Sequence, residues 1–521
     1  MGMMKSVSSN SFYQSYLNHN ESFCSCNTAF YYKKLLRKMI WSRDMKRKTG
    51  FYFTTNLGNT YFYNDDDGNV TLSKNCCDEP FVFDNDTDEV IPFYGDNNTI
   101  SQYLRHNGFS QMLLVVTEKC NLRCKYCIYS GNYDNQRKHG TNVMSFETAQ
   151  KAIDQFYKTQ MEAIASNALH IPLLGFYGGE PLMNLPLIKQ CVHYAKKLFN
   201  DNIRFLVTTN GTIMSEDIAD FLIENKFALS ISLNGDEKEN DRLRVFENNS
   251  GTFATIMNNV KKLRERDEEY FRKNVTFIGC YDWKSDLDAI NNFCKENEYN
   301  IPEIVRLTLV SDYFTDWYEQ FTPEEKRTFF DKKKAIGESL VKKLVNGEKI
   351  EPIERLLYAG TFTEVLNRCV NMPLSNFHPL FLPYSGSCVP GTKICVLPNG
   401  TIHCCEKINN TRPIGNVDEG INIQAIIDLL KDYYETMAPV CSKCPVKRLC
   451  PICFTACLGD DGKFTRSQIG DCRSVRESVR SKFTYVYNLL ENGILPNELL
   501  SMNSKRFLDK NRDTAEEVKK S

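Results

Sequence analysis

The sequence predicts an α/β protein built on a partial parallel β/α barrel, with a small α+β unit before the barrel and a cysteine-rich domain after it. Six short apolar segments between residues 111 and 310 are separated by helical patterns. Aromatic segments around a Leu57-Gly58-Asn59 turn precede them, and cysteines become dense from residue 385 to 475. Strands that alternate with helices are typical of a parallel sheet.

The first 109 residues are expected to form the α+β unit. A helical pattern lies within the first 45 residues, and FYFTTNLGNTYFYNDDDGNVTLS, which starts at Phe51, shows the alternation and turn residues of a β-meander. NNTISQYLRHNG, residues 97–108, predicts a short helix ended by glycine.

The barrel core is expected to span residues 110–314. Strands are predicted at QMLLVVT (111–117), IPLLGFYGGEP (171–181), IRFLVTTNG (203–211), FALSISLNG (227–235), NVTFIGCY (274–281) and EIVRLTLV (303–310). Helices are predicted at 146–160, 185–199, 215–226, 251–266 and 286–297. Barrels of this kind place their chemistry at the carboxyl ends of the strands.

Three further segments follow the barrel. Residues 315–384 predict a helical connector, residues 385–480 the cysteine-rich domain, and residues 481–521 a helix with a charged, mobile end. Inside the cysteine-rich domain, ICVLPNGTIHCCE has the form of a β-hairpin.

The composition excludes several partners. Lys and Arg number 64 against 65 Asp and Glu, which leaves a net charge of -1 and predicts no nucleic acid or membrane surface as a main partner. The amino terminus lacks the apolar segment of a signal peptide, and no apolar run is long enough to span a bilayer, so a cytoplasmic protein is expected. In a reducing compartment, the 21 cysteines favour metal binding over disulfides.

Three cysteines follow the first barrel strand in the spacing C-x3-C-x2-C: Cys120, Cys124 and Cys127. A zinc site would need a fourth ligand, and the nearest histidine is His139. Three unrelated buried cysteines are another interpretation. Three thiolates suit an iron–sulfur cluster, in which one iron then stays open for a substrate or cofactor.

With Tyr126 before its last cysteine, this loop resembles the signature of the radical S-adenosylmethionine (SAM) enzymes. The resemblance implies that the three cysteines hold a 4Fe–4S cluster whose fourth iron is chelated by the amino and carboxylate groups of SAM. It also implies that SAM is cleaved to a 5′-deoxyadenosyl radical, which abstracts a hydrogen atom from the substrate.

Other strand ends match the same family. Gly178-Gly179-Glu180-Pro181 resembles its GGEP motif, while Asn234 stands where the family usually has Asp. Arg242 lies close enough to compete with Arg244 for the SAM carboxylate. The SAM contacts that the resemblance implies are Tyr126, Gly178, Gly179, Glu180, Asn210, Ser232, Asn234 and Arg244.

The later cysteines resemble a SPASM domain, which carries two auxiliary 4Fe–4S clusters. The spacing departs once, because two residues rather than three separate Cys450 from Cys453. The resemblance implies one ligand set of Cys388, Cys405 and Cys453, with Cys395 as candidate fourth ligand, and a second set of Cys441, Cys444, Cys450 and Cys472. A zinc ribbon is the alternative.

The remaining cysteines have no cluster spacing. Cys404 and Cys457 are spare candidates within the cysteine-rich domain. Those expected to be ordinary small apolar residues are Cys24, Cys26, Cys76, Cys77, Cys191, Cys280, Cys294 and Cys369.

The resemblance covers roughly residues 110–480. It implies an oxidoreductase with SAM and three 4Fe–4S clusters that modifies a ribosomally synthesised precursor peptide, by a thioether or carbon–carbon crosslink. The amino-terminal unit is expected to bind the peptide's leader as an added strand, or alternatively to form a family-specific cap on the barrel. A flavodoxin or ferredoxin is expected to donate electrons. The alternatives are an anaerobic sulfatase maturase, which makes formylglycine, and a non-catalytic zinc-binding scaffold.

Overall fold

The computed structural model describes residues 49–73, 79–84, 93, 95–107, 109–166, 171–367, 382–383, 388–467, 469 and 472–504. The chain divides into two compact units, Met1–Lys48 and Thr49–Ser521, and every described residue belongs to the second. The helical pattern predicted within the first 45 residues and the end of the chain after residue 504 lie outside the described residues. The same holds for Cys24, Cys26, Cys76, Cys77 and Cys369.

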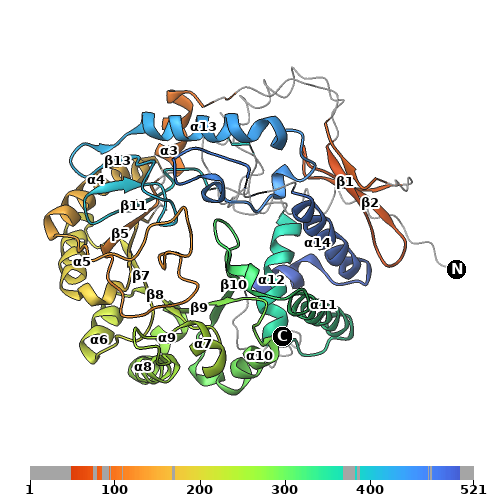
Figure 1. The fold of residues 1–521 in the computed structure, drawn as a ribbon, viewed down its shortest axis with the longest axis horizontal. Helices are drawn as coiled ribbons and strands as arrows, with labels where there is room; N and C mark the ends of the chain where they lie inside the picture. The colour runs from red at the N-terminus through yellow and green to blue at the C-terminus, as the bar shows by residue number, and fades with distance from the viewer. Residues whose placement is uncertain are drawn as a thin grey trace, which may run out of the picture. The chain divides into compact units, whose positions relative to one another are not determined.

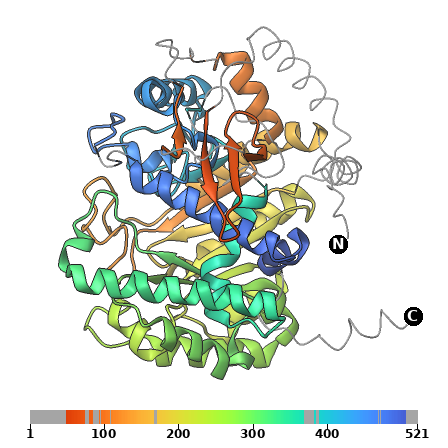
Figure 2. The same cartoon turned by 90° about the vertical axis from the view of Figure 1, so that its right-hand side faces the viewer.

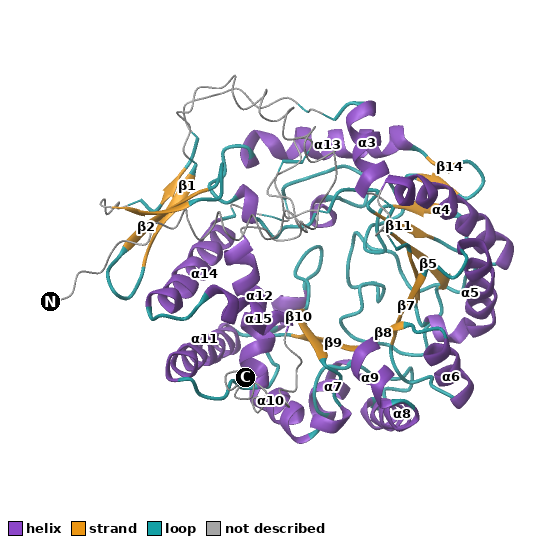
Figure 3. Ribbon diagram, turned by 180° about the vertical axis from the view of Figure 1, so that it is seen from behind, coloured by secondary structure: helices purple, strands orange, loops and turns teal. Residues whose placement is uncertain are grey.

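A ten-stranded sheet forms the centre of this unit, in the order β10-β9-β8-β7-β6-β5-β11-β12-β13-β14. Its first six strands run parallel, and each pairs with its neighbour in sequence (Figure 3). They are β5 (Gln111–Thr117), β6 (Leu173–Gly178), β7 (Arg204–Thr209), β8 (Ala228–Ser232), β9 (Val275–Tyr281) and β10 (Ile304–Leu309). The predicted α/β fold with a parallel barrel sheet is confirmed.

Helices connect these strands and lie along the outer side of the sheet (Figure 1). The predicted helices are present as α4 (Phe146–Ser166), α5 (Leu185–Phe199), α6 (Glu216–Glu224), α8 (Phe253–Arg266) and α10 (Leu287–Glu296). Two short helices, α7 (Glu237–Leu243) and α9 (Glu268–Asn274), were not predicted. Within the described residues, no helix is both long and apolar enough to cross a bilayer.

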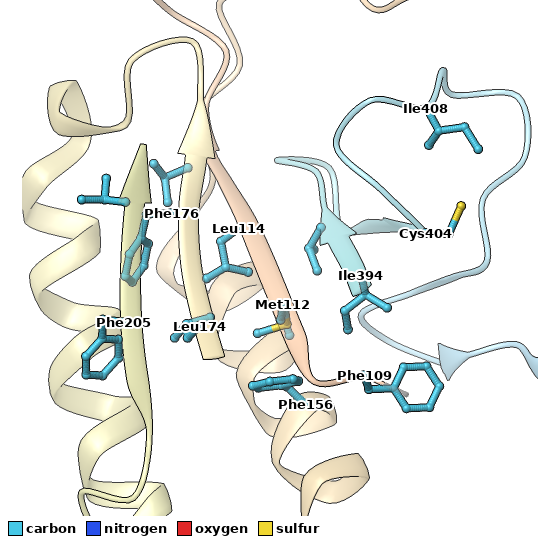
Figure 4. Packing of buried hydrophobic residues seen from close by; sticks show 14 of the residues in the cluster. Phe109, Met112, Leu114, Phe156, Leu174, Phe176, Phe205, Ile394, Cys404 and Ile408 are labelled. Atoms are coloured by element: carbon cyan, nitrogen blue, oxygen red, sulfur yellow. The ribbon is translucent and has the colours of Figure 1, made fainter. Parts of the chain in front are cut away.

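Burial on both faces explains why the barrel strands are apolar in sequence. Six of the seven residues of β5 are buried, so the strand lacks the polar alternation of a half-exposed sheet. Figure 4 shows Met112 and Leu114 of β5 between Leu174 of β6 and Ile394 from the cysteine-rich segment. One core therefore joins the barrel to the cysteine-rich segment.

The cysteine-rich segment continues the barrel sheet. Strand β11 (Lys393–Val396) pairs in parallel with β5, and β12 (Thr401–His403) turns back against β11 as the predicted hairpin. Strands β13 (Gly415–Asn416) and β14 (Gly420–Ile421) complete the sheet before helix α13 (Ile423–Cys441).

The described part of the amino-terminal segment forms a four-stranded antiparallel sheet, ordered β3-β2-β1-β4, and the helix α3 (Asn97–Asn107). Its strands are β1 (Gly50–Thr54), β2 (Thr60–Asn64), β3 (Val70–Ser73) and β4 (Phe81–Val82). This sheet packs on the carboxy-terminal helix α14 (Arg473–Glu491), as Figures 1 and 2 show. The rings of Phe51, Phe53 and Tyr63 lie 4.9–5.5 Å from that of Phe483.

The connector between the barrel and the cysteine-rich segment is helical, with α11 (Pro323–Asn346) and α12 (Pro352–Asn367). A capping box between Thr322 and Glu325 begins α11. Helices α11, α12, α14 and α15 (Pro496–Ser504) share a core with the amino-terminal sheet. Segments from both ends of the chain thus pack together.

Candidate active site at the carboxyl ends of the parallel strands

The loop after β5, residues 118–130, carries the predicted cluster ligands Cys120, Cys124 and Cys127, and we call it the three-cysteine loop. Its backbone is anchored to the segment that follows α7. Arg123 N donates to a carbonyl there at 2.8 Å and Lys125 N to another at 2.9 Å. The three thiols are free and half-buried, so they are held in place while they stay accessible to a bound group.

Backbone N–H groups of the loop donate hydrogen bonds to two of these sulfur atoms, which stabilises negative charge on them. Leu122 N donates to Cys120 Sγ at 3.4 Å, and Tyr129 N donates to Cys127 Sγ at 3.5 Å. Burial nevertheless raises the pKa of Cys120 to about 11 and that of Cys127 to about 12, and the neighbouring thiols add to both shifts. Ionising these thiols near neutral pH therefore requires a bound cationic group, as a metal centre provides.

A cluster and a single ion need different spacings of their donor groups. Among the residues that the structure describes, no three His, Cys, Asp or Glu side chains converge closely enough to hold one metal ion. A zinc ion would draw its sulfur ligands to about 2.3 Å from one point, whereas an iron–sulfur cluster holds its thiolates around a larger body. His139 Nε2 does approach Cys127 Sγ, at 3.6 Å, which makes it a hydrogen-bond neighbour of the loop.

The glycines of the GGEP segment permit close packing of two strand ends. Gly178 has a φ of 147°, and a Cβ atom on it would lie 2.0 Å from the carbonyl oxygen of Thr117. A Cβ atom on Gly179 would lie 2.2 Å from the carbonyl oxygen of Lys119. Both residues must therefore be glycine for β6 to end against the three-cysteine loop.

Glu180 lies fully buried between two strand ends. Its carboxylate accepts hydrogen bonds from Asn210 N (2.6 Å), Thr209 Oγ1 (2.8 Å) and Leu182 N (3.0 Å). Burial raises the pKa of Glu180, and these donors oppose the shift. Glu180 thus ties β6 to β7 and presents a buried acceptor beside Asn210, whose side chain reaches toward Cys120.

Arg244, Tyr126 and Asn234 form a buried polar group beside the three-cysteine loop. Arg244 Nη1 donates to Tyr126 Oη (3.0 Å), and Tyr126 Oη donates to Asn234 Oδ1 (3.2 Å). Arg244 Nε and Asn234 Nδ2 are buried with no hydrogen-bond partner in the described part of the chain. An unpaired buried donor costs about 1–3 kcal/mol, so this pair of donors fits a ligand that brings an acceptor such as a carboxylate.

The amide at position 234 suits this arrangement. Asn234 Oδ1 also accepts from Cys280 N at 3.0 Å, while its Nδ2 stays available as a donor. An aspartate could accept both hydrogen bonds but could not donate one. The departure from the usual aspartate therefore keeps the acceptor and adds a donor to the site.

The structure gives different partners to Arg242 and Arg244, the two candidates for binding the SAM carboxylate. Arg242 is bound by an acidic pair, since it contacts Asp282 with two hydrogen bonds of 2.9 Å and Glu239 at 3.3 Å. Arg244 instead faces Tyr126 and the three-cysteine loop. Ser232 ends β8, where it is half-buried.

The barrel strands and this site agree with a known domain. The sequence model of the radical SAM superfamily matches residues 114–282. Residues 114–282 are a radical SAM domain. The radical SAM family binds SAM and a 4Fe–4S cluster, and the three half-buried thiols and the unpaired donors of Arg244 and Asn234 fit those two groups.

Proteins similar to this chain include sulfatase-maturating enzymes and a radical SAM cyclopropyl synthase. It is 26% identical over 229 residues to the cysteine-type anaerobic sulfatase-maturating enzyme of Clostridium novyi (strain NT), which covers 43% of this chain and 58% of the relative. It is 24% identical over 241 residues to the radical SAM cyclopropyl synthase TigE of Paramaledivibacter caminithermalis, which covers 43% of this chain and 49% of the relative. The chain spans about half the length of the curated relatives it matches.

A solved structure of anSMEcpe with bound AdoMet and the Cp18Cys peptide has the same fold, with a TM-score of 0.51 at 17% identity. The match covers 73% of this chain and 98% of that chain. The shared fold therefore extends beyond the radical SAM domain into the segments that follow it.

The cysteine-rich segment contains a cavity lined by four cysteines, which we call the four-cysteine cavity. This cavity lies between the end of α13 and the start of α14. Its sulfur-bearing residues are Cys441, Cys444, Cys450 and Cys472, and its other lining residues are Val446, Lys447, Ile452, Arg466, Ile469 and Val475. The four cysteines predicted as one ligand set are thus brought together, although they are spread over 32 positions in sequence.

The other predicted ligand set lies near the barrel sheet. Cys388 is exposed, and its thiol lies close to that of Cys453. Cys405 Sγ donates to Glu406 Oε2 at 3.3 Å. Cys395, the candidate fourth ligand, is fully buried in β11. Cys404, named as a spare, is 2% exposed and close to Cys388 and Cys453.

Two residues that lie in or beside the candidate sites were not predicted from the sequence. Cys280, expected to be an ordinary apolar residue, lies among Tyr126 and Arg244 in the site. Its place near the end of β9 was a signal, because the strand ends carry the chemistry in such barrels. Arg466, which lines the four-cysteine cavity, had no sequence signal. Cys191 of α5 and Cys294 of α10 are buried in the hydrophobic core, as expected.

Proposed function

We propose that this chain is a radical SAM oxidoreductase that modifies a ribosomally synthesised precursor peptide, by a thioether or carbon–carbon crosslink. The observation that supports the proposal best is the combination of a radical SAM domain with a separate four-cysteine cavity in one fold. The relative TigE is named a radical SAM cyclopropyl synthase, and the structure of anSMEcpe holds a peptide. Both support a peptide as the class of substrate.

In this proposal the three-cysteine loop holds the SAM-binding 4Fe–4S cluster through Cys120, Cys124 and Cys127. When bound, the cluster and SAM together supply a 5′-deoxyadenosyl radical. Arg244 Nε and Asn234 Nδ2 donate to the SAM carboxylate, because both are buried donors without a partner in the described residues. The SAM pocket is completed by Glu180, Asn210, Ser232 and Tyr126. Gly178 and Gly179 have no side chain, so the backbone at these positions can approach SAM closely.

The cysteine-rich segment is proposed to hold two auxiliary 4Fe–4S clusters. One cluster is bound in the four-cysteine cavity by Cys441, Cys444, Cys450 and Cys472. The other is bound by Cys388, Cys405 and Cys453, with Cys395 as candidate fourth ligand. Such clusters supply one-electron acceptors, which an oxidative modification needs to turn a substrate radical into a closed-shell product. A flavodoxin or ferredoxin is the proposed electron donor.

Sulfatase maturation is the second candidate. Relatives include both cysteine-type and serine-type anaerobic sulfatase-maturating enzymes. The two functions share the site described above and differ in the substrate and in the bond formed. A maturase of sulfatases converts one side chain to formylglycine, whereas a crosslinking enzyme joins two residues of one peptide.

Mass spectrometry of co-expressed substrates distinguishes these functions. The chain is expressed anaerobically with a short peptide encoded beside its gene, and in parallel with a sulfatase. We expect the peptide to lose two hydrogen atoms per crosslink and to show fragmentation blocked across the bridge. An aldehyde on the sulfatase, with an unchanged peptide, would assign the chain to sulfatase maturation instead.

The leader of the precursor is proposed to bind at strand β3. In the described four-stranded sheet, β3 is an outer strand that pairs with β2 alone. Its Leu72 side chain is 65% exposed, so it is available to pack beside an added strand.

Replacing Leu72 with aspartate is expected to weaken binding of the fluorescently labelled precursor about tenfold in an anisotropy titration, because one apolar contact is lost. Leu57, in the β1–β2 turn, is 64% exposed and gives a matched control, so Leu57→Asp is expected to bind normally. Equal weakening by both variants would remove β3 as the binding edge.

A further inference from the structure

Arg466 faces the four-cysteine cavity with its guanidinium group. Its Nη1 donates to Cys441 Sγ at 3.4 Å, and its Nη2 donates to Cys472 Sγ at 3.9 Å. These two cysteines lie 31 positions apart in sequence, at the end of α13 and just before α14. One side chain thus spans the two sides of the cavity and contacts a sulfur atom on each.

The backbone around Arg466 holds it in this position. Leu458 and Phe464 form an antiparallel contact, and Thr465 N donates to Cys457 O at 2.7 Å. Ile469 N donates to the carbonyl oxygen of Arg466 at 3.0 Å. The backbone of Arg466 is therefore fixed by the chain on both sides of it, and the two sulfur contacts orient its guanidinium group.

Arg466 is charged and has no acidic partner in the described structure. The other cation of the cavity, Lys447, has its Nζ 3.0 Å from Asp66 Oδ1 and also interacts with the buried Asp65 and with Cys444. Arg466 is thus the cation of the cavity wall that donates hydrogen bonds to two of its sulfur atoms.

The cysteines of this cavity carry negative charge when they bind a cluster as thiolates. Apart from the cysteines and the cations Lys447 and Arg466, the cavity wall is apolar, with Val446, Ile452, Ile469 and Val475. In a low-dielectric site, a fixed positive charge stabilises anionic sulfur more strongly than it does in water.

We propose that Arg466 is a positioning residue that compensates the thiolate charge of this cavity and sets the reduction potential of the iron–sulfur cluster bound there. The proposal rests on the proposed function, since it requires an auxiliary cluster in the four-cysteine cavity. Hydrogen bonds to sulfur and the local net charge are among the main determinants of cluster potentials. One-electron reduction adds a negative charge, so a cation at the sulfur atoms stabilises the reduced form and raises the potential.

The test is potentiometry followed by electron paramagnetic resonance, with dithionite as reductant. To isolate the auxiliary clusters, the full chain carries alanine at Cys120, Cys124 and Cys127. In this background we expect Arg466→Met to shift one of the two remaining midpoints to a more negative potential. Arg466→Lys is expected to recover part of the shift, because lysine keeps the charge but cannot span both sulfur atoms.

Arg480→Met is the matched control. Arg480 lies on α14 and donates to Glu477 at 2.8 and 3.0 Å, so its loss is expected to leave both midpoints unchanged. Full iron content in Arg466→Met with unchanged potentials would overturn the inference. Loss of iron in Arg466→Met, with iron retained in Arg466→Lys and Arg480→Met, would support charge compensation as the role.

Failure of the proposed function gives a different result. If the four-cysteine cavity holds no cluster, the parent protein with alanine at Cys120, Cys124 and Cys127 has the same iron content with and without Cys444→Ala. That outcome rejects the auxiliary cluster itself, and with it the role of Arg466. If Cys444→Ala does lower the iron content but Arg466→Met leaves both midpoint potentials unchanged, only the role of Arg466 is rejected.

Discussion

Replacing Cys124 with alanine is expected to reduce the release of 5′-deoxyadenosine from SAM to background. Cys124 is one of three thiols in a loop that provides no further cysteine, so its loss leaves the SAM-binding cluster with two protein ligands. Loss of groups that merely support metal ligands costs about 10–100-fold in activity or affinity, and loss of a ligand is expected to exceed that. The measurement is chromatography of 5′-deoxyadenosine after anaerobic incubation with SAM and dithionite.

The same variant is expected to keep about two thirds of the iron, because the two auxiliary clusters do not depend on this loop. Cys191→Ala is the matched control, since Cys191 is fully buried in α5 of the same domain and lies away from the strand ends. It is expected to cost about 1 kcal/mol of stability and to leave SAM cleavage intact. Continued 5′-deoxyadenosine release by Cys124→Ala would refute the assignment of the loop.

Replacing Cys444 with alanine is expected to produce the opposite pattern. The iron content should fall by about a third, from about twelve atoms per chain, while SAM is still cleaved and no modified substrate forms. The physical reason is that Cys444 lines the four-cysteine cavity together with Cys441, Cys450 and Cys472, the other three proposed ligands of one auxiliary cluster. Iron and acid-labile sulfide analysis, 5′-deoxyadenosine assay and mass spectrometry of the substrate measure the three effects.

Cys294→Ala gives the control for this variant. Cys294 is 4% exposed in α10, with apolar neighbours, so its replacement should change neither iron content nor product. An unaltered iron content in Cys444→Ala would remove Cys444 as a ligand. Bound zinc without sulfide in the parent protein would favour the zinc-binding scaffold over the enzyme.

Most of the barrel could be predicted because helices and strands leave local patterns. The periodicity of LPLIKQCVHYAKKLF predicted residues 185–199, and the helix α5 spans Leu185–Phe199. The seven-residue helices α7 and α9 were missed because so few turns give little periodicity. The pairing of β11 with β5 was also missed, since the two strands lie about 280 positions apart and their apolar sequences carry no sign of which neighbour they choose.

By itself, the sequence determined the radical SAM domain, because the three-cysteine spacing, the GGEP segment and the order of strands are properties of short, contiguous segments. Only the tertiary structure showed that Arg242 and Arg244 have different partners, because two neighbours at one helix end differ in what lies across from them: Asp282 for the first and Tyr126 for the second. The tertiary structure alone also placed Arg466 on two sulfur atoms. Such contacts depend on where distant segments pack, which no local pattern records.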